Sequence, residues 1–101
     1  MEQEKLLKRL ELIGNLIGLG DYEDIQGQVL KLRGFGLPAE VLGIVSELER
    51  GRYSGAGAKI SEYLQANRGL VRFGDREREG YRLKIRMLKV QIGVLENEKG
   101  K

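Results

Sequence analysis

The chain has 101 residues, of which 41% are hydrophobic and 33% are charged, and its formal net charge is +3. It contains no Cys and no His, which excludes disulfides and thiolate nucleophiles and removes the side chain most used for proton transfer near neutral pH. No apolar run approaches the roughly 20 residues that span a membrane, and nothing resembles a signal peptide. We therefore expect a cytoplasmic, bacterial-type protein with no membrane partner.

Two helices are predicted in the first third of the chain. The first runs from Glu2 to about Ile17, because its apolar residues recur at spacings of three and four, and the glycines from Gly18 onward end it. Asp21 is a preferred N-cap residue and begins a second helix that continues to Gly34.

Two more short helices are predicted before residue 70. Pro38 fits the first position of the third helix, because its missing N–H needs no partner there, and Gly51 closes that helix. Ser54 is expected to cap a fourth helix that reaches about Asn67, with Gly69 as its stop. The four helices then pair off as two hairpins.

The two hairpins are similar at their turns. Gly20-Asp21-Tyr22 precedes the second helix and Gly51-Arg52-Tyr53 precedes the fourth, so the apparent period is 31 residues. This pattern resembles the tetratricopeptide-type helical hairpin, whose repeat has 34 residues. The position that is small in that family is Ile25 in one unit and Ala56 in the other. The resemblance implies helical hairpins, but not that family's peptide-binding groove.

A long fifth helix is predicted over residues 75–99, after a connector at residues 70–74, with Asp75 as its N-cap. On a helical projection its apolar residues form two stripes on opposite sides. One stripe consists of Tyr81, Ile85, Leu88, Ile92 and Leu95, and the other of Leu83, Met87, Val90 and Val94. Because a single stripe is enough to cover the helix's own domain, the second stripe predicts a second partner.

We expect the stripe from Leu83 to Val94 to pack on the helical body, and the stripe from Tyr81 to Leu95 to form a coiled-coil dimer. An antiparallel pair centred near residue 90 matches apolar residues with one another and basic residues with acidic ones. The partner is expected to be a second copy of the chain or another coiled-coil protein. The predicted interface residues are Tyr81, Ile85, Leu88, Ile92, Leu95, Arg82, Lys84, Glu96 and Glu98.

Nucleic-acid binding is the alternative function, because charge is distributed unevenly along the chain. Residues 1–50 carry 6 Lys or Arg against 9 Asp or Glu, whereas residues 51–101 carry 12 against 6. Basic residues on one helix edge can neutralise phosphates. The candidate phosphate contacts are Arg78, Arg82, Arg86 and Lys89. The competing interpretation is a solvated flank of a coiled coil.

Residues 60–99 also resemble a helical region of uncharacterised bacterial proteins, in some of which a longer coiled coil leads on to a J-domain. The residues that carry this resemblance are Tyr63, Leu64, Asn67, Leu83, Lys84, Leu95, Asn97, Glu98 and Lys99. The J-domain motif His-Pro-Asp is absent from this chain, so the resemblance does not imply co-chaperone activity.

The sequence thus predicts an all-α protein with a helical body at residues 1–69 and a long amphipathic C-terminal helix. Its expected function is non-enzymatic protein–protein interaction or oligomerisation, because these residues offer no nucleophile–base pair. We expect no cofactor and no metal. The acidic residues Asp21, Glu23 and Asp24 are interpreted as the start of a helix, which attracts acids through its dipole.

Overall fold

Five α-helices form the fold in a computed structural model, which describes residues 2–34, 36–69 and 77–99, with the side chains of residues 2, 98 and 99 left out. The helices are α1 (Glu2–Leu19), α2 (Tyr22–Leu32), α3 (Ala39–Glu49), α4 (Tyr53–Arg68) and α5 (Arg78–Lys99). The described residues contain no strand, which confirms the all-α prediction. The predicted connector at residues 70–74 and the Asp75 cap lie outside them.

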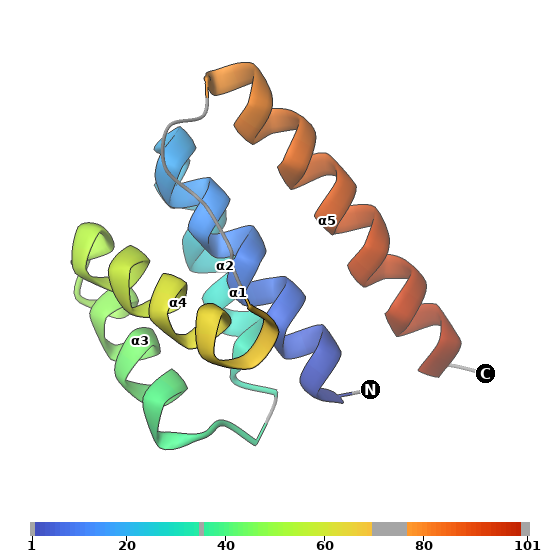
Figure 1. Cartoon of the computed structure of the whole chain (residues 1–101), viewed down its shortest axis with the longest axis horizontal. Helices are drawn as coiled ribbons and strands as arrows, with labels where there is room; N and C mark the ends of the chain where they lie inside the picture. The colour runs from blue at the N-terminus through green and yellow to red at the C-terminus, as the bar shows by residue number, and fades with distance from the viewer. Residues whose placement is uncertain (1, 35, 70–76, 100–101) are drawn as a thin grey trace.

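Helix α1 is the central element of the fold. It packs against α2, α4 and α5, whereas α3 packs against α2 and α4 (Figure 1). Leu10 and Ile13 are completely buried, and between Lys5 and Leu16 only Lys8 is not buried. Four of the buried side chains on α1 are polar: Lys5, Arg9, Glu11 and Asn15. This helix therefore has no solvent-facing side over most of its length.

The two helical turns that looked alike in the sequence share one backbone geometry. Gly20 and Gly51 have φ values of 85° and 76°, in the left-handed region that favours glycine. The residues that follow, Asp21 and Arg52, have φ and ψ of −87° and 74°, and of −88° and 65°. In each turn the N–H of that residue donates to the carbonyl oxygen five residues earlier, at 3.1 and 2.9 Å. Both turns thus end a helix with a Schellman-type bond.

Aromatic stacking joins the starts of α2 and α4. The rings of Tyr22 and Tyr53 are 4.3 Å apart and nearly parallel, with an interplanar angle of 10°. The Gln26 amide donates to the Tyr53 hydroxyl and to the Leu48 carbonyl oxygen, both at 3.0 Å. The equivalent positions of the two turns therefore meet in space.

Two predicted helix starts need correction. Helix α4 begins at Tyr53, with Arg52 as N-cap, so Ser54 lies inside the first turn and does not cap it. The reason is the Gly51 turn, which leads directly into α4. Pro38 is the N-cap of α3 and not its first residue. The Asp21 cap is confirmed, because its side chain accepts a hydrogen bond from the Asp24 N–H.

Helix α5 runs antiparallel to α1 (Figure 1), and the start of α5 lies beside the end of α1. Its buried residues form a row that we call the inner row: Tyr81, Ile85, Leu88 and Ile92. Gly18 was predicted to end α1, but the helix continues through it to Leu19. Gly18 instead provides space for α5, because a Cβ atom built there overlaps the ring of Tyr81.

We predict that Gly18→Ala destabilises the protein. Alanine normally stabilises a helix relative to glycine, but here its methyl group pushes against a buried aromatic ring. Overpacking of this kind costs about 1–3 kcal/mol, and each kcal/mol lowers the melting temperature by about 4–8 °C in a domain of this size. Thermal denaturation followed by circular dichroism measures the change.

Gly27→Ala is the matched control. Gly27 lies within α2, and no atom lies within 4 Å of the position that an added methyl group would take, so the substitution should raise the melting temperature. In a Tyr81→Ala background, Gly18→Ala should also become neutral or stabilising. If Gly18→Ala stabilises the otherwise unchanged protein as Gly27→Ala does, the described packing of Tyr81 is incorrect.

Candidate functional site

The two apolar stripes of α5 face opposite ways, as predicted, but their assignment is reversed. The inner row, predicted to be a dimer seam, is buried in the chain's own core, and Leu95 is half-buried beside it. The stripe predicted to pack on the body is exposed. We call it the outer row: Leu83 (58% exposed), Met87 (45%), Val90 (62%) and Val94 (51%).

Side-chain size explains the reversal. The inner row offers Tyr, Ile, Leu and Ile, which remove more apolar area from water on burial than the Leu, Met, Val and Val of the outer row. The inner row also has a complementary surface on α1, since Gly18 leaves room for the Tyr81 ring. The face with the larger gain from burial is therefore the one that packs within the chain.

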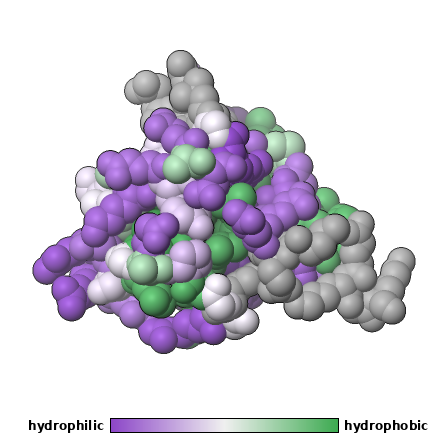
Figure 2. All heavy atoms as spheres, turned by 60° about the horizontal axis from the view of Figure 1, so that its bottom comes forward, coloured by the Kyte–Doolittle hydropathy of each residue, from purple (hydrophilic) through white to green (hydrophobic). Residues whose placement is uncertain are grey.

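The outer row forms a straight apolar surface on one side of α5. Its members follow one another at spacings of four, three and four residues, which is the pattern of a coiled-coil seam. At 1.5 Å per residue, the row extends about 17 Å along the helix. Figure 2 shows apolar surface at the right edge of the molecule, the side on which α5 lies in Figure 1. A continuous exposed row of this kind is a candidate docking surface.

A three-residue ion-pair network holds one edge of α5 against the body. The Glu11 carboxylate on α1 is nearly buried and lies 2.7 Å from the Arg68 guanidinium of α4 and 3.2 Å from the Lys84 ammonium of α5. Lys8 on α1 donates to the Gln91 side chain on α5 at 3.1 Å. One carboxylate thus links three helices.

A buried arginine holds the C-terminal half of α5. Arg9 donates to the Gln28 side chain at 2.5 Å and lies 3.3 Å from the Glu96 carboxylate. Burial lowers the pKa of the Arg9 guanidinium, and the charge of Glu96 offsets part of that effect. Removing Glu96 would leave the buried Arg9 guanidinium without a neighbouring negative charge, which destabilises the folded state.

A second ion pair connects α5 to α2. The Lys89 ammonium donates to the Asp24 carboxylate at 2.8 Å, and Gln28 donates to the same carboxylate at 3.4 Å. Burial raises the pKa of Asp24, but the hydrogen bonds from Lys89 and Gln28, and the charges of Lys89 and Lys31, outweigh it. The pKa of Asp24 therefore lies below its ordinary value.

These contacts use charged residues that had been predicted to face a partner. Lys84 and Glu96 pair with Glu11 and Arg9 of the same chain. The side chain of Glu98 lies outside the described residues. Arg82 is exposed and 3.9 Å from Glu79 on its own helix.

One of the four candidate phosphate contacts forms an ion pair with a residue of another helix. Lys89 is exposed but paired with Asp24, and Arg78 and Arg86 are exposed as well. Nucleic-acid binding by this edge stays a prediction, and Lys89 would have to exchange Asp24 for a phosphate to contribute to it.

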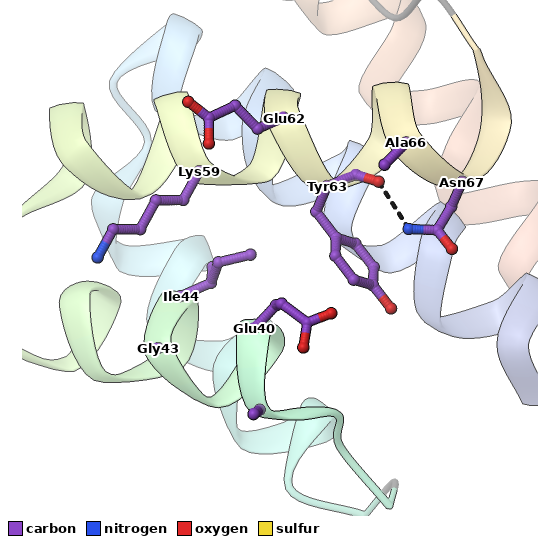
Figure 3. Close-up of a pocket in the computed structure, with 9 residues that line it drawn as sticks. Glu40, Gly43, Ile44, Lys59, Glu62, Tyr63, Ala66 and Asn67 are labelled. Atoms are coloured by element: carbon purple, nitrogen blue, oxygen red, sulfur yellow. Dashed lines mark hydrogen bonds between the residues drawn. The ribbon is translucent and has the colours of Figure 1, made fainter.

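A shallow groove of about 460 Å³ lies between α3 and α4 (Figure 3). Its lining includes the small residues Gly43 and Ala66 and the side chain of Tyr63. The Lys59 side chain points away from Tyr63 in Figure 3, and its ammonium lies 3.3 Å from the Glu47 carboxylate. The Glu40 carboxylate lies beside the Tyr63 ring.

Several polar side chains line this groove. Burial raises the pKa of Tyr63, and the charge of Glu40 raises it further, so its hydroxyl stays protonated at neutral pH. The Asn67 side-chain amide donates a hydrogen bond to the Tyr63 carbonyl oxygen at 2.8 Å. The groove therefore presents a phenol, two carboxylates and the Lys59 ammonium, and the raised pKa of Tyr63 leaves its phenol a weak nucleophile.

The residues that sequence reasoning missed are the polar ones on α1. On a helical projection Glu11 lies on the polar face of α1 and Arg9 lies among its apolar residues, yet both are buried and bind α5. A partial signal was present, because the apolar residues of α1 cover more than half of its circumference: Leu6, Leu7, Leu10, Leu12, Ile13 and Leu16. A helix with so wide an apolar face typically packs against more than one neighbour.

We predict that the bond between Asp24 and Lys89 stabilises the protein only when Asp24 is ionised. Because the pKa of Asp24 is lowered in the folded state, this contribution is present above the ordinary value of 3.8 and is lost as pH falls through the lowered pKa. Asp24→Asn should therefore lower the melting temperature at pH 6–7, and this effect should shrink as the pH is lowered to about 2.

Glu23→Gln serves as the control, since it removes a carboxylate from the same helical turn and leaves the Asp24–Lys89 bond in place. A loss of stability in Asp24→Asn that is equal at both pH values would contradict the ion pair.

In the described stretches no three acidic side chains gather in the way that a metal ion requires. No helix among the same residues is both long and apolar enough to cross a membrane. No protein-family model, curated protein or solved structure matches this chain.

Proposed function

We propose that this chain is a non-enzymatic helical association module that forms a homodimer through the outer row of α5. The observation that carries the proposal is the exposure of four apolar side chains at coiled-coil spacing on a helix whose opposite side is fully packed. In this proposal α5 is the coiled-coil helix that the sequence predicts, with the opposite face as its seam.

The way α5 is anchored supports this proposal. The inner row and the ion pairs of Glu11, Arg9 and Asp24 fix the helix along α1 on both of its edges. The outer row is then presented on a preformed helix, so a partner does not have to order it. Preorganisation reduces the entropic cost of association.

The size of the outer row indicates a weak dimer. Full burial of an aliphatic side chain is worth about 1.5–3 kcal/mol, so covering the exposed half of each outer-row residue gives roughly 1 kcal/mol. Eight such residues in a symmetric pair give about 8 kcal/mol, against an association cost of about 4–15 kcal/mol. The flanks of the seam must contribute, and the dimer should form at roughly micromolar to millimolar concentrations.

We predict that Met87→Glu and Val90→Glu abolish the dimer without unfolding the protein. Each substitution places a carboxylate at the centre of the seam, where pairing would bury two like charges. Neither side chain belongs to the core, so the melting temperature of the monomer should change little. Sedimentation equilibrium over concentrations up to about 1 mM measures the mass, and circular dichroism checks the fold.

Leu42→Glu is the matched control. Leu42 is a similarly exposed leucine (55%) on α3, a helix that does not pack on α5. This variant should keep the dimer. A wild-type chain that stays monomeric over the whole concentration range, or a dimer that survives Met87→Glu and Val90→Glu, would rule the proposal out.

A further inference from the structure

We propose that the two copies of α5 pair antiparallel, with the two-fold axis passing between Leu88 and Lys89, on the side of the helix that carries the outer row. This inference rests on the proposed dimer and adds its orientation and register. The outer row is symmetric about that point, because its spacings of four, three and four residues read the same in both directions. A two-fold axis there places Leu83 opposite Val94 of the second copy, and Met87 opposite Val90.

Side-chain volumes favour this orientation. In the antiparallel register every layer of the seam combines one large side chain, Leu83 or Met87, with one valine. In a parallel pair two layers of large side chains, at residues 83 and 87, are followed by two layers of valines, so the helix separation that suits one half of the seam leaves the other half crowded or hollow. Facing large with small residues gives even packing along the seam.

The residues beside the outer row also fit the antiparallel register. Gly93 of one copy lies across from the exposed Arg86 of the other, which leaves space for the arginine stem to run along the seam. On the other edge Lys84 lies near Gln91 of the second copy. Lys84 and Gln91 are already oriented by Glu11 and Lys8 of their own chains. The register therefore brings no like charges into direct opposition at these four positions.

Charge along α5 gives an independent argument for orientation. Residues 78–89 carry five basic side chains and one acidic side chain, whereas residues 90–99 carry one basic and two acidic. Lys84, Lys89 and Glu96 are paired within their own chain, which leaves the arginines at 78, 82 and 86 as the excess charge of the first half. Antiparallel pairing sets these arginines of the two copies farther apart, whereas parallel pairing places them side by side. The helix dipoles add to this preference, because opposed helices put unlike ends side by side. Charge thus sets the orientation and the apolar row supplies the contact.

Cysteine cross-linking tests the orientation, and the absence of Cys from the natural chain leaves no background thiol. We compare Leu83→Cys, Val94→Cys and an equal mixture of the two under mild oxidation, with Leu42→Cys to measure random collision. In the antiparallel register residues 83 and 94 of different copies face each other, whereas two copies of residue 83 are about 17 Å apart. A disulfide needs Cα atoms within about 7 Å.

The expected result is covalent dimer in the mixture and only the Leu42→Cys background in each single variant. Sedimentation of the same reduced samples shows whether each is dimeric at the concentration used. Efficient cross-linking of Leu83→Cys with itself would show a parallel dimer and overturn the orientation while the proposed dimer stands. Dimeric samples that cross-link in no combination would place the interface elsewhere, and monomeric samples would remove the proposed function itself.

Discussion

The contact between α5 and α1 is the constraint on which the rest of the structure depends. Among the described helices α1 is the one that approaches α5 closely along its length, so this contact alone decides which side of α5 is covered. The inner row fills that contact, and Gly18 allows Tyr81 to enter it. Everything on the opposite side of α5 is left for solvent or for a partner.

The same contact explains the unusual composition of α1. A central helix needs apolar residues on several sides, but the edges of its contact with α5 are lined by charged groups. Glu11 joins α1 to α4 and α5, and Arg9 joins α1 to α2 and α5. Such partly buried pairs add little net stability, but breaking one leaves a buried charge without a partner, which lowers the free energy of unfolding. They therefore oppose rotation of α5 about its own axis, which would exchange the inner and outer rows.

Much of the fold could be predicted from the sequence, because its signals are local. The glycines at 20 and 51 and the Asp21 cap determine where helices end and begin, and apolar spacing shows that α5 has two faces. Which face is covered could not be predicted in this way, since it depends on how Tyr81 fits against Gly18, 63 residues earlier in the chain. The roles of Arg9 and Glu11 were missed for the same reason: their partners are distant in sequence.

Hydroxyl-radical footprinting of the wild-type chain at low and high protein concentration tests the central claim most directly. Its readout is the labelling rate of individual side chains, which follows their exposure to solvent. The account predicts that Leu83 and Met87 are labelled at low concentration and protected at high concentration, while Tyr81 and Leu88 are protected at both. Strong labelling of Tyr81 and Leu88 in the dilute protein, with Leu83 and Met87 protected, would contradict it.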